Sequence, residues 1–185
     1  MDQNTPSTNK KPAHFGLWLL VLGLFVVAGL LIARDADIMK QAALENPVGR
    51  PAPDAPVTTL GGDPARLSSL RGHPVWLNFF ATWCPPCKAE MPQIEQRYQR
   101  LHNDRLEVVG LDQQETPKLI QPFVNRLGVT FPILIDEGPA AAAYSVFALP
   151  TSVFIDSQGV VRAVKIGEMS PAEMDADLKL IDGNS

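Results

Sequence analysis

The chain has 185 residues, of which 45% are hydrophobic and 19% are charged, and its net charge is −4. This length allows one ordinary domain with a short appendage, and the apolar content excludes a wholly disordered chain. The negative charge gives no electrostatic support for a nucleic-acid partner. The chain has only two cysteines, which excludes a disulfide scaffold and a four-cysteine zinc site.

The first feature along the chain is an apolar block that follows a polar tail, 1–14. From Phe15 to Ala33 there are 19 residues without a charge, and as a helix they would span about 28 Å, close to the thickness of a bilayer's hydrocarbon core. We therefore expect a transmembrane helix at 15–33 and a tether at 34–50. A cleaved signal peptide is the alternative, but its apolar core would be shorter and would precede a small-residue cleavage site.

The remaining 135 residues, 51–185, alternate between strand-like and helix-like segments. Short β-rich or apolar runs predict strands at 55–60, 75–80, 106–111, 133–135, 152–155 and 160–166. Helical spacing and helix-start signals predict helices after Cys84, after Pro117, over 139–144 and after Ser170, and Pro122 is expected to kink the second. This order predicts an α/β domain with a mixed central sheet and helices on both faces.

The sequence Trp83-Cys84-Pro85-Pro86-Cys87 carries the chemistry, because it lies between a predicted buried strand and a predicted helix. Cys84 is expected at the helix N-cap, where free N–H groups and the macrodipole stabilise a thiolate. Cys87, one turn into the helix, is expected to be more buried and to attack a mixed disulfide at Cys84. These features predict a redox-active disulfide.

Other uses of the two cysteines are weaker. A purely structural disulfide would close a very short loop and would gain little stability. Zinc needs four ligands, haem attachment needs a histidine where the chain has Lys88, and no metal is expected. A copper-handling protein stays open as an alternative, with both sulfurs as soft ligands and His73 as a third.

The segment 77–92 resembles the active-site segment of membrane-anchored thioredoxin-like thiol:disulfide oxidoreductases of the TlpA, ResA and CcmG (DsbE) type. Segments 49–53 and 67–72 match the start of these proteins, so the resemblance covers about 48–181. It implies a thioredoxin-like fold with an extra N-terminal strand, and no cofactor. A thioredoxin-fold binding module without catalysis remains the alternative.

The resemblance also implies a location and partners. The catalytic domain would lie on the periplasmic side of a bacterial inner membrane, held there by the single helix at 15–33. Its substrates would be protein thiols and disulfides, and a membrane-embedded reductant of the DsbD or CcdA kind would regenerate it. The family suggests that it reduces disulfides, in some members during cytochrome c maturation.

Three substrate-binding residues follow from the same resemblance. Pro150 matches the family's cis-proline, which faces the cysteine pair, and the backbone of Leu149 would pair with an incoming peptide. Trp83 matches the residue beside the nucleophile, although simple packing would also explain it.

Glu90 matches an acidic residue near the cysteines in ResA-like members, three residues after Cys87 on the same helical face. It could accept or return the Cys87 proton, or it could be an ordinary solvated glutamate. Thioredoxin has a buried aspartate six residues before its first active-site cysteine, and here that position is Asn78, which cannot titrate.

The segment 145–151 departs from the cytochrome c maturation members. Those proteins usually carry Gly-Val-x-Gly-x-Pro-Glu here, whereas this chain has Ser145-Val-Phe-Ala-Leu-Pro150-Thr151. The departure favours the broader TlpA/ResA-like group over a role specific to haem proteins.

Overall fold

The computed structural model describes residues 23–24, 47–102 and 106–182. The chain divides into two units, Met1–Glu45 and Asn46–Ser185, and the second is considered below. Apart from Gly23 and Leu24, the expected transmembrane helix at 15–33 lies outside the described residues. Within the described ranges, no helix is long and apolar enough to cross a membrane.

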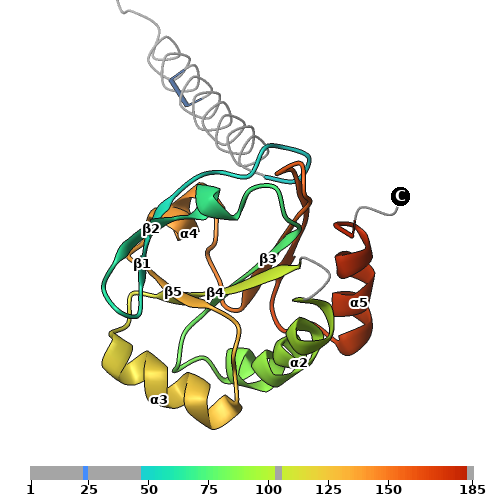
Figure 1. The fold of residues 1–185 in the computed structure, drawn as a ribbon. Helices are drawn as coiled ribbons and strands as arrows, with labels where there is room; N and C mark the ends of the chain where they lie inside the picture. Colours follow the sequence, from blue (N-terminus) through green and yellow to red (C-terminus); the bar gives the residue numbers. More distant parts are fainter. Residues whose placement is uncertain (1–22, 25–46, 103–105, 183–185) are drawn as a thin grey trace, which may run out of the picture. The chain divides into compact units, whose positions relative to one another are not determined.

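A seven-stranded mixed sheet forms the centre of the second unit, in the order β2-β1-β5-β4-β3-β6-β7 (Figure 1). Strands β3, β4 and β5 are parallel, whereas β6 is antiparallel to β3 and β7, and β1 is antiparallel to β5 and β2. The strands are β1 Pro56–Thr59, β2 Pro64–Arg66, β3 Val75–Phe80, β4 Glu107–Gln113, β5 Ile133–Asp136, β6 Thr151–Ile155 and β7 Val161–Ile166.

Helices cover both faces of the sheet, as predicted (Figure 1). Apolar side chains of α2, α3 and α5 share one buried cluster, which also contains both cysteines. Ala140 of α4 and Leu67 of η1 belong to a second cluster on the opposite face. The helices are η1 Leu67–Leu70, α2 Pro85–Leu101, α3 Pro117–Leu127, α4 Pro139–Ala143 and α5 Pro171–Lys179.

The N-terminal part of the sheet differs from the prediction. The extra N-terminal strand, β1, is present, but β2 was not predicted. Strand β2 pairs with β1 as a hairpin, with Val57 opposite Ala65. Its three residues include a proline and an arginine, so the segment lacks the alternating or apolar pattern by which a strand is recognised.

Helices α3 and α5 contain the proline and the capping box that the sequence marked. Helix α3 continues through Pro122 to Leu127, so this proline does not end it. Helix α5 begins with the predicted capping box, in which Ser170 and Glu173 satisfy each other's backbone N–H groups.

A buried Arg97 ties α5 to α2, because its Nε and Nη2 donate to the two carboxylate oxygens of Asp175 at 2.8 and 3.0 Å.

Strand β3 is buried along its whole length, which confirms the predicted central strand. Because side chains alternate across a strand, its residues divide between the two clusters. Trp76 and Phe80 belong to the cluster beneath α2, and Leu77 and Phe79 to the opposite cluster. Asn78, between Trp76 and Phe80, therefore lies on the α2 side.

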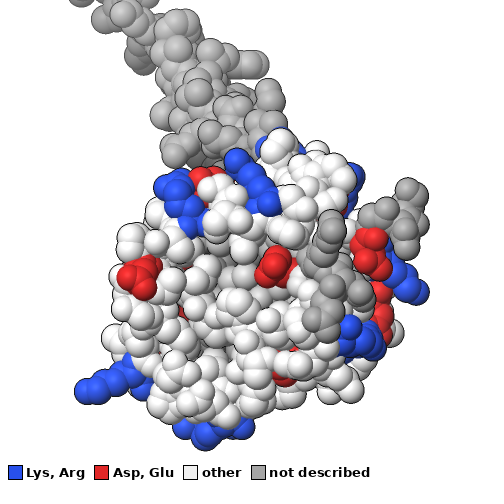
Figure 2. Space-filling model, in the orientation of Figure 1, with Lys and Arg blue, Asp and Glu red and all other residues white. Residues whose placement is uncertain are grey.

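The face of this unit that Figure 2 draws is mixed in charge. Figure 2 shows acidic and basic side chains interspersed with broad uncharged areas on the face that it draws.

Candidate active site

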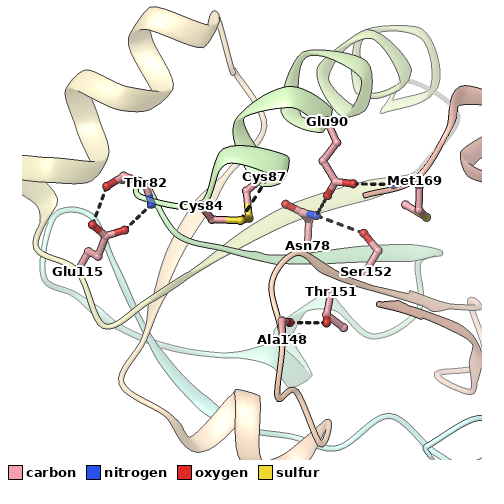
Figure 3. The surroundings of a disulfide bond; sticks show 10 residues. All are labelled: Asn78, Thr82, Cys84, Cys87, Glu90, Glu115, Ala148, Thr151, Ser152 and Met169. Atoms are coloured by element: carbon pink, nitrogen blue, oxygen red, sulfur yellow. Dashed lines mark hydrogen bonds between the residues drawn. A yellow bond between two sulfur atoms is a disulfide. The ribbon is translucent and has the colours of Figure 1, made fainter. Parts of the chain in front are cut away.

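Cys84 and Cys87 form a disulfide across the first turn of α2 (Figure 3). The S–S distance is 2.05 Å and the two Cα atoms are 5.3 Å apart. Cys84 is the N-cap residue, and its Sγ accepts a hydrogen bond from the Cys87 N–H at 3.3 Å. Pro85 follows at the first helical position, where no N–H partner is needed. The predicted N-cap position of Cys84 is confirmed.

The two cysteines are buried, whereas the tryptophan that precedes them is exposed. Cys87 is 0% exposed and Cys84 only 3%, so both belong to the core cluster in the disulfide form. Trp83, in contrast, is 69% exposed. Packing at the end of the strand therefore does not account for this tryptophan, and its ring is available to a partner.

The loop before β6 lies at the same end of the sheet as the disulfide. The Leu149–Pro150 peptide bond is cis, as predicted. Thr151 pairs with Phe79 near the end of β3, which places Pro150 level with the residues that lead into Cys84. The Thr151 hydroxyl donates to the Ala148 carbonyl oxygen at 2.7 Å and fixes the turn.

Glu90 is a buried carboxyl, 1% exposed, and not the solvated glutamate of the alternative interpretation. Its Oε1 accepts from Asn78 Nδ2 at 2.7 Å, and its Oε2 accepts from the Met169 N–H at 3.1 Å (Figure 3). Burial raises the pKa of Glu90 from 4.5 to about 7, although both hydrogen bonds act in the opposite direction. The helix thus carries a group that titrates near neutral pH, one turn after Cys87.

Asn78 connects Glu90 to the neighbouring strand. Its Nδ2 also lies 3.2 Å from Ser152 Oγ, which accepts a second hydrogen bond from Trp76 Nε1 at 2.9 Å. Ser152 is the cross-strand partner of Asn78 in the sheet. Sequence reasoning missed Ser152 and Met169, because their roles depend on strand register and on a backbone N–H.

A second acidic group holds the turn before the disulfide. Glu115, in the loop after β4, accepts hydrogen bonds from the Thr82 N–H at 2.5 Å and from the Thr82 hydroxyl at 2.6 Å (Figure 3). Asp112 Oδ1 in turn accepts from the Glu115 N–H at 3.0 Å. Burial, together with the charge of Glu115, raises the pKa of Asp112 from 3.8 to about 7.

Sequence reasoning also missed these two carboxyls. The available signal was two acidic residues, Asp112 and Glu115, three apart at the end of a predicted strand parallel to the one that leads into Cys84. Ends of neighbouring parallel strands meet at one edge of a sheet, so such residues could have been placed near the cysteines.

The structure contradicts the copper site that included His73. His73 precedes β3 and Cys84 follows it, and a six-residue strand is about 20 Å long. His73 instead lines a small cavity beside Tyr144, on the opposite face of the sheet. Across the described ranges, no group of three His, Cys, Asp or Glu side chains could hold a metal ion.

A buried strand that ends in a Cys-x-x-Cys disulfide at a helix N-terminus, with a cis-proline loop at the same edge, defines the class of thioredoxin-like redox proteins. The chain belongs to the AhpC/TSA family, whose model matches residues 48–164. It is 39% identical over 135 residues to the thiol-disulfide oxidoreductase ResA of Bacillus thuringiensis, an alignment that covers 72% of this chain and 78% of that protein.

Solved structures agree with this assignment. A thiol:disulfide interchange protein of the thioredoxin family from Chlorobium tepidum matches with a TM-score of 0.65 and 30% identity, over 74% of this chain and 97% of that one. A secreted disulfide oxidoreductase of Mycobacterium tuberculosis, homologous to DsbE, matches with a TM-score of 0.60 and 30% identity, over 68% and 94%. The chain is a thiol-disulfide oxidoreductase with a thioredoxin-like fold, as the resemblance predicted.

The contact between Glu115 and Thr82 leads to a first prediction. Glu115→Ala removes two hydrogen bonds from the turn before Cys84, and we expect the free energy of unfolding to fall by about 1–3 kcal/mol. Urea unfolding of the disulfide form measures this change. Glu137→Ala removes an exposed carboxylate elsewhere and serves as the control, with an expected change below about 0.5 kcal/mol. Equal effects of the two substitutions would show that Glu115 does not stabilise the turn.

The buried Glu90 leads to a second prediction. Its pKa is raised from 4.5 to about 7, so the stability that this carboxyl contributes is fully present below about pH 4.5 and is lost as the pH rises through about 7. Relative to Glu90→Gln, the native protein should lose about 3 kcal/mol of unfolding free energy between about pH 4.5 and about pH 8. Urea unfolding of both proteins at each pH measures the difference between their unfolding free energies. Asp112 titrates in both proteins, so its contribution largely cancels from this difference. A difference in unfolding free energy that does not change with pH would contradict this prediction.

Proposed function

We propose that this oxidoreductase reduces disulfide bonds of proteins outside the cytoplasm through Cys84 and Cys87. One observation carries the proposal: the disulfide closes the first turn of α2, one turn before a buried carboxyl that titrates near neutral pH. A disulfide across three residues gains little stability from loop closure, so exchange explains it better than structural support does.

The first half of the proposed reaction takes place at Cys84. In the reduced enzyme its thiolate, stabilised at the N-terminus of α2, attacks a disulfide of the substrate. One substrate sulfur leaves as a thiolate and takes a proton from solvent. The other is now bonded to Cys84 in a mixed disulfide.

The second half needs a proton acceptor for Cys87. Its thiol loses a proton to Glu90 and attacks Cys84 Sγ, which breaks the bond to the substrate. The second substrate sulfur leaves as a thiolate and takes a proton from solvent, so the substrate leaves with two thiols and the enzyme keeps the Cys84–Cys87 disulfide described above. Glu90 lines an open groove together with Gln93 and Glu168, which provides a route for its proton to reach solvent.

Substrate contacts are proposed for three residues at the edge of the site. The exposed ring of Trp83 would cover an apolar part of the substrate, and the backbone of Leu149 before Pro150 would pair with an extended segment. Phe147, in the same loop as Leu149, is 82% exposed and offers a second apolar contact.

The proposed location is the periplasmic side of a bacterial inner membrane, with one transmembrane helix at 15–33. A membrane-embedded thiol donor of the DsbD or CcdA kind would reduce the disulfide after each turnover. Apocytochromes c are included among the proposed substrates only on the family resemblance, and the departure at segment 145–151 favours a broader set of protein disulfides.

A trapping experiment tests the reaction. Cys87→Ser removes the resolving thiol, so we expect mixed disulfides to accumulate at Cys84 in intact cells and to disappear on reduction. Cys84→Ser is the matched control and should trap nothing, because Cys87 is buried. If Cys87→Ser traps no protein and the native domain does not reduce a protein disulfide such as that of insulin, the proposed function is wrong.

A fusion experiment tests the location. Alkaline phosphatase, which needs an oxidising compartment, is fused after Ser185 in a bacterial host. We expect an active fusion in the membrane fraction, and loss from that fraction when 15–33 is deleted. An inactive phosphatase with an active cytoplasmic reporter at the same site would reverse the proposed topology.

A further inference from the structure

Asn78 has one polar atom that the contacts above do not explain. Its side chain is fully buried, and its Nδ2 donates to Glu90 and to Ser152. Its Oδ1 has no hydrogen-bond partner among the described residues. An unpaired buried carbonyl oxygen is costly, and most buried polar groups avoid it. At a reactive site, such an atom calls for an explanation in the chemistry of the site.

The surrounding groups determine which end of the carboxamide is unpaired. Above about pH 7 the Glu90 carboxyl is ionised and can only accept hydrogen bonds, so the amide nitrogen faces it. The same nitrogen donates to Ser152 Oγ, which also accepts from Trp76 Nε1. The oxygen then points the other way. Figure 3 shows Asn78 Oδ1 turned toward the disulfide and Nδ2 turned toward Glu90 and Ser152.

The fold places this oxygen on the side of Cys87. Asn78 lies on the face of β3 that packs beneath α2, in the cluster that contains both cysteines. Cys87 and Glu90 are three apart and therefore follow each other along one face of α2. A carboxamide that bonds Glu90 at 2.7 Å consequently lies under the same helical face as the Cys87 sulfur.

We propose that Asn78 Oδ1 accepts a hydrogen bond from the Cys87 thiol when the pair is reduced. In the disulfide, Cys87 Sγ carries no hydrogen, and the oxygen is left unpaired. Reduction by a dithiol donor adds two electrons and two protons, breaks the S–S bond and gives Cys87 an S–H group. That group pairs with the oxygen, so Asn78 is a positioning residue that stabilises the reduced enzyme.

This inference rests on the proposed function and adds the direction in which Asn78 shifts the equilibrium between the disulfide and dithiol forms. The unpaired oxygen disfavours the disulfide form, and the S–H bond favours the dithiol form. Both effects raise the tendency of the enzyme to hold its cysteines reduced. Removing the oxygen should therefore shift the equilibrium toward the disulfide.

The test is the equilibrium of the domain with reduced and oxidised glutathione. Asn78→Leu keeps the approximate volume and removes the oxygen. We expect the equilibrium constant to move about tenfold toward the disulfide, which corresponds to a potential about 30 mV lower. The same shift is expected when Glu90→Gln is present in both proteins. A shift that vanishes in the Glu90→Gln background would show that Asn78 acts only through Glu90, and would overturn the inference.

Ser152→Ala is the matched control, because it removes the other partner of the carboxamide and leaves Oδ1 in place. We expect its equilibrium constant to change less than about threefold. A tenfold shift in this control as well would mean that any break in the network alters the potential, which contradicts a specific role of Oδ1.

An infrared spectrum provides a readout that does not depend on how Asn78→Leu folds. In Cys84→Ser the only thiol is that of Cys87, and we expect its S–H stretching band at a lower frequency than that of an alkyl thiol in a non-bonding solvent. A band at the unbonded frequency would overturn the inference. Neither the glutathione equilibrium nor the infrared spectrum needs catalytic turnover. Failure of the trapping experiment would therefore contradict the proposed function without changing the result for Asn78.

Discussion

The burial of β3 on both faces is the constraint from which the site is built. A strand without a solvent-facing side carries a polar residue at a cost unless that residue is hydrogen-bonded, and Asn78 meets this condition with its Nδ2, which donates to Glu90 and Ser152. The strand also determines where Cys84 lies, since the chain leaves β3 at Phe80 and enters α2 at Pro85. Strand β3 thus carries the buried amide and leads directly into the N-cap sulfur, and the amide in turn binds the buried carboxyl of α2.

Two carboxyl groups, Glu90 and Asp112, have pKa values raised to about 7 for partly different reasons. Burial raises the pKa of Glu90 to about 7 against two hydrogen bonds, whereas burial and the neighbouring charge of Glu115 raise that of Asp112. Glu90 reaches the site from α2, and Asp112 reaches it from the end of β4. Glu90 is thus suited to proton transfer, whereas the charge of Asp112 is linked through Glu115 to the turn at Thr82.

Sequence patterns predicted the features that depend on local chemistry. The N-cap cysteine, the capping box at Ser170, the buried strand and the cis bond before Pro150 each follow from a few adjacent residues or from the family resemblance. Contacts set by register or by backbone atoms could not be predicted in this way. Ser152 meets Asn78 only because β6 pairs with β3, and Met169 binds Glu90 through an N–H that any residue would offer.

The short spacing of the cysteines has a consequence for repeated turnover. The disulfide joins residues three apart at the start of α2. This helix is also fixed by Arg97, which binds Asp175 of the capped helix α5, and by the core cluster that contains both cysteines. Opening the bond releases little chain entropy, because the loop it closes is so small. Each catalytic cycle can therefore break and remake a covalent link without unfolding the domain.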